Sequence, residues 1–303
     1  MTAQNVNSTN VRLRTISFLL RTTAALSPAL AARVLERLFV ATRRFDAPER
    51  ERRWLESMAP ASFTSRGREL VAWSVGRGPT VLLAHGWEGR GSQMGAFIAP
   101  LRSAGFRVVT FDSPGHGDSL GRQSSLVEMA DAVADAASAF GPVHAVIAHS
   151  AGAAATAVAL SNRLELERAV FVAPPADLGG FLVKVTRKLG LEDEVALLAR
   201  RRLEAKFQVD WDTLRAETLA PAMTTPLLVI HDHGDREVRF DNATRLTDAW
   251  PGSRLMRTDG LGHQRVLRDE DVIAKAVAFV LGDDAETSSN VHASRVAVSP
   301  ASC

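Results

Sequence analysis

Short apolar runs recur through the middle of the chain, and amphipathic helical patterns separate them. These runs lack the alternation of apolar and polar positions that marks a strand with one solvent-exposed face. They are therefore typical of strands buried on both faces. Buried strands that alternate with helices predict a mainly parallel sheet covered by helices on both sides, which is the α/β class. The runs are TVLLAHG (80–86), FRVVTFD (106–112), VHAVIAH (143–149), RAVFVAP (168–174) and PLLVIHD (226–232), and a meander of two strands, ASFTSRG (61–67) and ELVAWSV (69–75), precedes them.

The N-terminal part of the chain has a different pattern. Its first ten residues are polar and are expected to lack regular structure, whereas residues 11–58 are helical in pattern and rich in arginine. This segment is interpreted either as a helical extension packed on the main domain or as a basic amphipathic helix lying on anionic lipid. The apolar residues expected to share one face of a helix are Leu30, Val34, Leu35 and Leu38.

A second helical segment interrupts the predicted sheet. Between Pro175 and Pro226 the chain has helical patterns, of which VALLARRRLEAKF (195–207) is the clearest, and no buried strand. An insertion between two sheet strands is well placed to act as a lid over a site. The predicted organisation is an N-terminal tail and helical extension (1–58), a core (59–175 and 223–282), a helical cap (176–222) and a disordered tail (283–303).

Composition narrows the possible functions. The chain has 303 residues, 46% of them hydrophobic, which is enough for a large core in one or two domains. Its formal net charge of +2 gives no electrostatic reason to expect nucleic acid as a partner. Tyrosine is absent, so no tyrosine can act as a catalytic acid. The single cysteine is Cys303, so we expect no intrachain disulfide and no catalytic cysteine.

The best candidate for a membrane span is residues 16–34, but Arg21, Pro28 and Arg33 interrupt it. The same segment lacks the unbroken apolar centre of a secretory signal. We therefore expect a cytoplasmic protein without stable membrane insertion, for which peripheral membrane contact through the basic N-terminal helix stays open. The sequence does not indicate the oligomeric state.

The segment AVIAHSAGAAAT (145–156) carries the first sign of chemistry. A buried strand ends at Ser150, and a helix that starts with alanine and glycine residues begins directly after it. Ala148 and Gly152, two residues before and two after the serine, are small enough for strand and helix to approach closely. The serine hydroxyl would then project alone at the carboxyl end of the sheet, with the backbone N–H of Ala151 beside it.

This segment resembles the nucleophile elbow of the α/β-hydrolase family, Gly-x-Ser-x-Gly, with Ala148 in place of the first glycine. A serine that merely caps a helix is the alternative. Two further segments occur in the family's order, LLAHGWEG (82–89) and TFDSPGHGDS (110–119). The resemblance implies that the backbone N–H of Trp87 is a second oxyanion donor and that His85 is structural. Asp112 and His116 are expected to bond the backbone of their own loop.

A serine nucleophile needs a base, and the base needs a carboxylate to orient it. Downstream of the serine lie His231, His233, His263 and His292. In the family the order is nucleophile, acid, histidine, and the resemblance assigns the base to His263, in a glycine-hinged loop before the last helix. The same resemblance places the acid at Asp235, with Asp232 as the rival.

Two other interpretations involve bound groups. His231, His233 and Asp235 partly match the ligand motif of binuclear zinc hydrolases, but Arg236 stands where that motif has a further histidine. We therefore expect no metal. No glycine-rich phosphate loop is present in the sequence, so no nucleotide cofactor is expected either.

The predicted function is hydrolysis of an ester or related acyl bond in a small-molecule substrate through an acyl-enzyme on Ser150. The alternatives are an acyltransferase that uses the same residues and a non-catalytic ligand-binding protein. A peptidase, lipase, thioesterase or carbon–carbon hydrolase would share this machinery, since the substrate depends on the lid. The lid residues expected to shape the pocket are Phe181, Leu182, Leu197 and Phe207.

Overall fold

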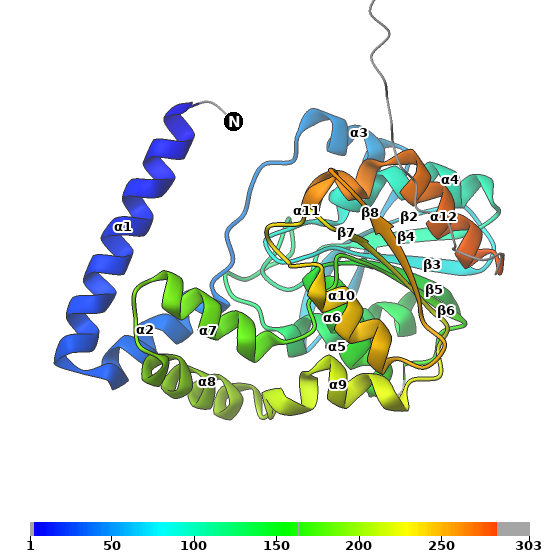
Figure 1. Cartoon of the computed structure of the whole chain (residues 1–303). Helices are drawn as coiled ribbons and strands as arrows, with labels where there is room; N and C mark the ends of the chain where they lie inside the picture. The colour runs from blue at the N-terminus through cyan, green and yellow to red at the C-terminus, as the bar shows by residue number, and fades with distance from the viewer. Residues whose placement is uncertain (1–2, 163, 284–303) are drawn as a thin grey trace, which may run out of the picture.

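A single central sheet organises the molecule (Figure 1). The structure is a computed structural model that describes residues 3–162 and 164–283, and within them eight strands form the sheet. The strands are β1 (Ala59–Ser65), β2 (Arg68–Val75), β3 (Thr80–Ala84), β4 (Arg107–Phe111), β5 (Val143–His149), β6 (Arg168–Val172), β7 (Leu227–Asp232) and β8 (Arg254–Thr258). Their order is β1-β2-β4-β3-β5-β6-β7-β8.

The pairing of the strands follows the hydrophobic pattern. β1 and β2 are antiparallel to their neighbours, and β3 to β8 pair in parallel. In the middle of the sheet Val81 of β3 lies beside Val108 of β4 and Ala145 of β5, and all three are fully buried. The mainly parallel α/β sheet that the apolar runs predict is therefore confirmed.

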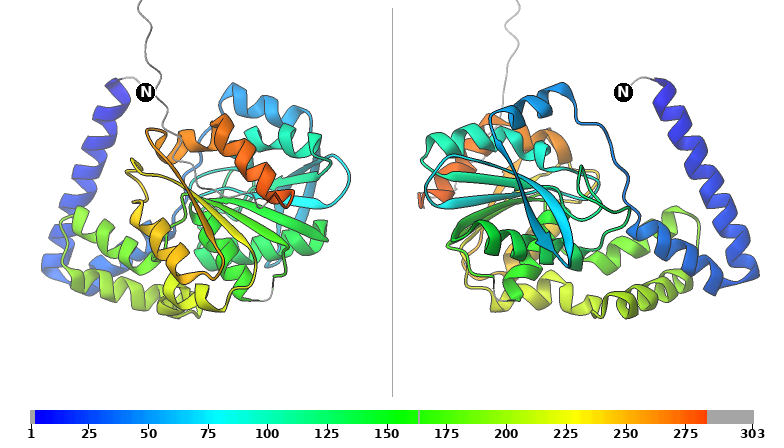
Figure 2. Two further views of the ribbon diagram at one scale, coloured as in Figure 1. Left: turned by 45° about the vertical axis from the view of Figure 1, so that its right-hand side comes forward. Right: turned by 180° about the vertical axis from the view of Figure 1, so that it is seen from behind.

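Helices cover both faces of the sheet (Figure 2). Around the sheet lie α4 (Ile98–Ser103), α5 (Leu126–Phe140), α6 (Ala151–Ser161), α10 (Asp241–Ala249), α11 (Gly262–Arg265) and α12 (Glu270–Val280), with 3-10 turns η1 (Gly91–Phe97) and η4 (Val266–Arg268). α5, α6 and α10 close one apolar core, and α4 and α12 close the other. Burial of apolar surface on both sides is what makes the central strands uniformly hydrophobic.

The segment between β6 and β7 is helical throughout. It contains α7 (Leu178–Lys188), α8 (Asp193–Phe207), η2 (Trp211–Leu214), α9 (Ala216–Leu219) and η3 (Ala220–Ala222). α7 and α8 lie beside the sheet domain, where a cap was expected (Figure 1).

Three helices precede the sheet: α1 (Ala3–Leu26), α2 (Pro28–Val40) and α3 (Glu49–Glu56). α2 packs along α8, and α1 projects from the body of the molecule (Figure 2). The cap helices and the N-terminal helices share a third apolar core, to which Leu20, Leu35, Leu182, Leu203 and Trp211 belong. α1, α2 and the cap are thus one helical layer built from two distant segments of sequence, whereas α3 packs on η1.

Two expectations for this extension were wrong. The first ten residues were expected to lack regular structure, but α1 begins at Ala3, and no glycine or proline occurs before Pro28 to interrupt it. The apolar face of α2 was also misplaced. Ala31, Ala32 and Leu35 are buried, whereas Leu30 and Leu38 are 52% and 44% exposed. The small alanines face inward because they allow α2 to approach α8 closely.

Some expectations concern residues that the structure does not describe. His292 and Cys303 lie outside the described residues, as does the predicted tail beyond Asp283. Among the described residues, none of the helices is long and apolar enough to cross a bilayer.

Candidate active site

The turn between β5 and α6 places Ser150 at the carboxyl edge of the sheet. Ser150 has φ 51° and ψ −122°, a conformation that costs a non-glycine residue on the order of 1–3 kcal/mol. Its backbone N–H donates to the carbonyl of Val172 on the neighbouring strand, at 2.9 Å. Gly152 is needed here, because a Cβ at this position would lie 2.4 Å from the carbonyl oxygen of His85. α6 therefore approaches the end of β3 closely, whereas the small residues were expected to let it approach β5.

His263 reaches Ser150 from α11. Its Nε2 lies 3.1 Å from Ser150 Oγ, and its Nδ1 lies 2.7 Å from Asp235 Oδ2. Because the carboxylate can only accept, Nδ1 carries the proton and Nε2 is free to accept from the serine hydroxyl. The three side chains come from segments 113 and 28 residues apart and form one hydrogen-bonded line. This arrangement can activate an oxygen nucleophile.

Asp235 is held in place by its own loop. Its Oδ1 accepts from the backbone N–H groups of Glu237 and Val238, at 2.8 and 3.0 Å. His231, fully buried, donates from Nε2 to the carbonyl oxygen of Val238 at 2.9 Å, and the same nitrogen lies 3.4 Å from Oδ2. Burial by itself would raise the pKa of Asp235, but the contacts with His231 and His263 outweigh it and hold this pKa well below its usual range. The carboxylate is therefore ionised and fixed beside the imidazole.

Asp232, the rival for the acid, has other partners. Its Oδ2 accepts from Thr258 Oγ1 at 3.0 Å and from the backbone N–H of Leu261 at 2.9 Å. Its Oδ1 accepts from the N–H of Gly234, at 3.0 Å. The carboxylate thus anchors the loop that leads to His263 without bonding the imidazole.

His149, directly before the serine, contacts the base in a way that the sequence analysis missed. Its Nε2 lies 3.0 Å from the carbonyl oxygen of His263, and the two rings are 4.6 Å apart. Since a carbonyl only accepts, His149 donates from Nε2. Burial lowers the pKa of His149 from 6.5 to about 3, so the ring stays neutral. The polar pair His149–Ser150 at the end of an apolar strand was the sequence signal that could have indicated this contact.

The loop after β3 carries Trp87 past the serine. A Cβ on Gly86 would lie 2.9 Å from the Cβ of Ser150, so the loop backbone passes directly over the nucleophile. Among the described residues, neither the N–H of Trp87 nor that of Ala151 has a hydrogen-bond acceptor. Both are available to a ligand atom near Ser150, as an oxyanion would require.

The neighbouring side chains bond this part of the backbone, as expected. His85 accepts from the N–H of Ser113 at its Nε2, 2.9 Å away, and burial lowers its pKa to about 3. Asp112 accepts from the N–H groups of Gly91 and Asp118, at 2.6 and 2.7 Å. His116 Nδ1 lies 2.9 Å from the carbonyl of Pro114. The structural interpretation of His85, Asp112 and His116 is confirmed by these contacts.

The N-terminal extension also binds this loop. Arg43 pairs with Glu88 through both carboxylate oxygens, Nε to Oε1 at 2.9 Å and Nη2 to Oε2 at 3.0 Å. Glu88, next to Trp87, has a positive φ of 53°. A second and more buried pair joins Glu51 of α3 to Arg90, at 2.7 Å. Two ion pairs thus connect the extension to the loop that passes Ser150.

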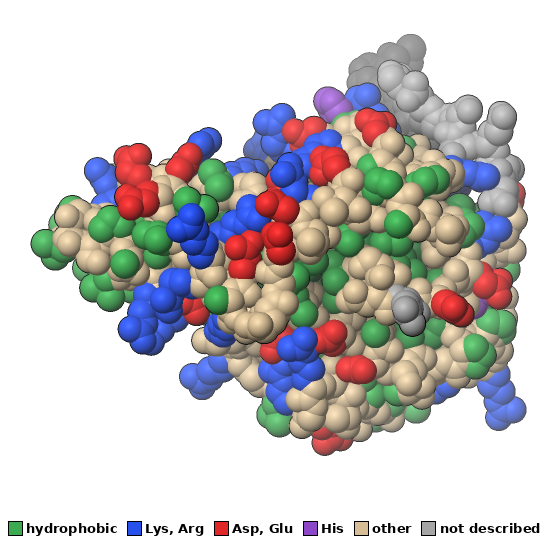
Figure 3. Space-filling model, turned by 90° about the horizontal axis from the view of Figure 1, so that it is seen from below, with side chains coloured by type: hydrophobic (Ala, Val, Ile, Leu, Met, Phe, Trp, Pro, Cys, Tyr) green, Lys and Arg blue, Asp and Glu red, His purple; other side chains and the backbone are tan. Residues whose placement is uncertain are grey.

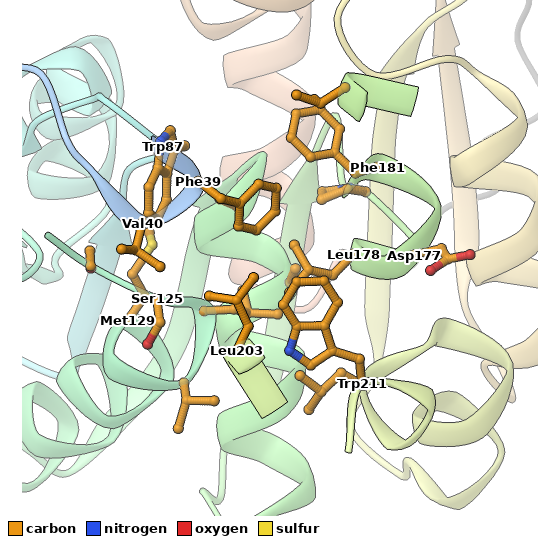
Figure 4. Close-up of a pocket in the computed structure, with 18 of the residues that line it drawn as sticks. Phe39, Val40, Trp87, Ser125, Met129, Asp177, Leu178, Phe181, Leu203 and Trp211 are labelled. Carbon is orange, nitrogen blue, oxygen red and sulfur yellow. The ribbon is translucent and has the colours of Figure 1, made fainter. Parts of the chain in front are cut away.

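A cavity of about 370 Å³ opens beside Ser150 and Trp87 (Figure 4). Most of its wall is apolar and comes from three sources: the sheet domain, the cap and α2. Seen from below, charged side chains of both signs are interspersed with apolar ones over the surface, so this face shows no patch of a single sign (Figure 3). Of the lid residues expected to shape the pocket, Phe181 and Phe207 line it. Leu182 does not line it and is buried in the third apolar core, whereas Leu197 is 49% exposed and does not line it either.

The zinc-like motif does not converge on one point. His231 and Asp235 are buried, but His233 is exposed, with its ring beside Phe240. Within the described part of the chain, no three His, Cys, Asp or Glu side chains lie close enough together to hold a metal ion.

Solved structures with this fold include two esterases and a phospholipase. An esterase from Exiguobacterium antarcticum superposes with a TM-score of 0.58 at 16% identity, over 74% of this chain and all of that one. Carboxylesterase CesB from Bacillus subtilis gives 0.58 at 16% identity, over 77% of this chain and 96% of its own. A bacterial membrane phospholipase A gives 0.61 at 17% identity, over 92% of this chain and 100% of its own. At sequence identities of 16–17%, the structural similarity establishes a shared fold and no more than that.

No curated protein matches the sequence. The profile described as the alpha/beta hydrolase family matches residues 81–276, from β3 into α12, and so contains the elbow, the loop with Trp87 and the segments of Asp235 and His263. Since this match spans more than half of the chain, the protein belongs to the alpha/beta hydrolase family and is a hydrolase.

Proposed function

We propose that this protein hydrolyses carboxylic esters with an apolar acyl group, through an acyl-enzyme on Ser150. The observation that carries the proposal is the hydrogen-bonded line from Ser150 Oγ through His263 to Asp235, at 3.1 and 2.7 Å. The apolar wall of the adjoining cavity favours an uncharged hydrocarbon acyl group over a polar one. Several structurally similar proteins are esterases or a phospholipase by name, which agrees with an ester substrate.

In the proposed mechanism the Oγ of Ser150 attacks the ester carbonyl while His263 Nε2 takes the hydroxyl proton. The N–H groups of Trp87 and Ala151 stabilise the negative oxygen of the tetrahedral intermediate. His263 then gives the proton to the leaving alkoxide, and the alcohol departs. A water molecule that loses its proton to His263 attacks the acyl-enzyme. The bond from the acyl carbon to Ser150 Oγ then breaks as His263 returns the proton to that oxygen, and the carboxylic acid leaves. Asp235 keeps the proton on Nδ1 and stabilises the imidazolium that forms twice in the cycle.

The first test is covalent labelling with a fluorophosphonate probe, together with turnover of nitrophenyl esters. Wild-type protein is expected to be labelled, and Ser150→Ala to lose labelling and turnover on the order of a millionfold. Ser161→Ala, at the other end of α6, is the matched control and is expected to behave as wild type. Wild-type protein that folds but neither reacts with the probe nor turns over any ester would contradict the proposal and favour a ligand-binding role.

The second test separates hydrolysis from acyl transfer. Products are analysed with and without an added alcohol or amine at millimolar concentration. Free carboxylic acid as the main product in both cases is the expected result. A dominant new ester or amide would show that the acyl-enzyme passes its acyl group to that nucleophile in preference to water.

A further inference from the structure

The wall of the cavity beside Ser150 is shared between the cap and the N-terminal helix α2. α2 contributes Leu35, Leu38 and Phe39, and the cap contributes chiefly Phe181, Leu203 and Trp211. These two segments lie more than 130 residues apart in sequence, yet Leu35, Leu203 and Trp211 are at most 4% exposed and belong to one apolar core. The cavity would therefore lose one side without α2.

Ion pairs account for the charged side chains around the cavity. Arg43 and Glu88 pair with each other at 2.9 Å, and Asp177 lies 3.7 Å from Arg215 and 3.9 Å from Arg245. A charged or strongly polar ligand group would have to compete with these pairs, whereas a hydrocarbon chain needs only apolar contacts. The cavity is thus suited to a chain of methylene groups.

Phe39 has a central position in this cavity. It projects from α2 toward the cap, where its ring lies 6.2 Å from that of Phe181 and 5.7 Å from that of Trp211 (Figure 4). A ring in this position limits how far a chain that starts at Ser150 can extend between α2 and the cap.

α2 is held firmly enough to act as a wall. Glu36 of α2 pairs with Arg202 of α8 at 2.7 Å, and the carbonyl of Val40, its last residue, accepts from the N–H of Ser124 at 2.9 Å. Ser27 caps its first turn through a hydrogen bond from the N–H of Leu30, at 3.3 Å. Side chains on a helix anchored at Glu36 and at its last residue can discriminate between ligands of different length.

We infer that α2 and the cap together bind a single acyl chain of medium length, and that Phe39 sets the upper limit of its length. The volume of about 370 Å³ lies at the small end of the range for ligand sites, so it accommodates one such chain and not two. This inference rests on the proposed function, since it assigns the bound chain to the acyl group that Ser150 accepts.

The test is the chain-length profile of kcat/KM for nitrophenyl esters of about two to sixteen carbons in Phe39→Leu, Phe39→Ala and Phe39→Trp. The smaller side chains are expected to raise the preference for long over medium chains by about tenfold, and tryptophan to shift it toward short chains. Nitrophenyl acetate provides the short-chain reference against which the long-chain preference of each variant is expressed. Phe45→Ala is the matched control, because Phe45 lies in the same extension, is 55% exposed and does not line the cavity.

A wild-type profile in the folded Phe39→Leu and Phe39→Trp variants would overturn the inference, as would an equal loss at every chain length. Binding of primary alcohols of graded length to Ser150→Ala provides a readout independent of turnover, because Trp87 and Trp211 line the cavity and report a ligand by fluorescence. Alcohol binding that depends on Phe39 in a protein that fails to react with fluorophosphonate would refute the proposed function and keep the chain site. A protein that reacts with fluorophosphonate but shows no selectivity for chain length would refute the chain site and keep the proposed function.

Discussion

At the scale of single residues, the two aspartates at the end of β7 differ in what they bind. Asp235 accepts from His263, and Asp232 accepts from Thr258 and from the loop that leads to the same histidine. Both carboxylates therefore affect the imidazole, one by direct contact and the other through the backbone.

Asp235→Asn is expected to lower kcat on the order of ten-thousandfold, because an amide donor at Oδ2 disfavours the tautomer in which His263 Nε2 is free to accept. Asp232→Asn is expected to cost far less activity and to lower the stability of the fold. The measurements are steady-state kinetics normalised to the concentration of folded protein, and urea denaturation. A larger kinetic loss in Asp232→Asn than in Asp235→Asn would reverse the assignment of the acid.

His149 is the second residue whose contact predicts a measurable effect. His149→Phe keeps a ring beside His263 but removes the hydrogen bond to its carbonyl, a contact worth about 1 kcal/mol. We expect kcat to fall about five- to tenfold with little change in KM, and His149→Gln, which retains a side-chain N–H, to recover part of the loss. Equal turnover numbers for His149→Phe and wild type would show that this contact does not position the base.

The elbow gives a prediction about stability. Gly152→Ala would place a Cβ 2.4 Å from the carbonyl oxygen of His85 and 2.8 Å from that of Ala84, both of them backbone atoms with little freedom to move. We expect a loss of about 1–3 kcal/mol in the free energy of unfolding. Ala148→Gly, which installs the first glycine of the family motif, is the control and should change stability by about 1 kcal/mol or less. Denaturant unfolding of both variants provides the comparison. An unchanged free energy of unfolding in Gly152→Ala would disprove the close approach.

At the scale of elements, the N-terminal extension and the loop after β3 act as a unit. The connection from α2 to α3 bonds the loop at Gly115 through Thr42 Oγ1, at 2.8 Å, and the loop at Glu88 through Arg43. The extension therefore contributes both a wall of the cavity and a support for the backbone at Trp87.

Arg43→Gln is expected to lower kcat about three- to fivefold, because Glu88 then loses its partner next to the proposed oxyanion donor. The effect is modest, since Arg43 is largely exposed and exposed pairs contribute about 0–1 kcal/mol. Arg187→Gln, which breaks a similar exposed pair with Asp193 in the cap, should leave kcat unchanged. The reversed pair Arg43→Glu with Glu88→Arg should restore part of the rate. Identical kcat values for Arg43→Gln and Arg187→Gln would contradict a positioning role.

At the scale of the whole molecule, buried titratable groups link stability to pH. Burial lowers the pKa of His85 and His149 from 6.5 to about 3, so between these values the unfolded chain binds protons that the folded chain does not. Their contribution to stability is present above pH 6.5 and is lost as the pH falls toward 3, by about 1.4 kcal/mol per pH unit for each histidine. Burial raises the pKa of Asp112 to about 6, which acts in the opposite sense between about pH 4 and 6.

Because two histidines oppose one carboxyl, the midpoint of urea unfolding is expected to be lower at pH 5 than at pH 7. Replacement of His149 by glutamine should reduce this difference, and replacement of the exposed His233 should not. An equal or higher midpoint at pH 5 would show that these imidazoles are protonated in the folded protein.

The sequence by itself determined the features that depend on neighbouring residues. The buried runs indicated the strands of the sheet, and the small residues around Ser150 indicated the sharp turn. Both are local properties, because strand burial and turn geometry depend on residues within one segment. Asp235 and His263 were assigned from the resemblance to the α/β-hydrolase family. The chain's own apolar pattern also indicated that the segment 176–222 adds no strand to the sheet, and helices occupy it.

Only the tertiary structure decided how distant segments meet. Periodicity shows that a helix has an apolar face but not which partner that face will contact, so the inward side of α2 was misplaced and its union with α8 was not foreseen. The contact of His149 with the carbonyl of His263 joins residues 114 positions apart, and no local pattern reports such a distance. Packing decides these contacts, because the shape of each surface selects its partner only when the whole chain is folded.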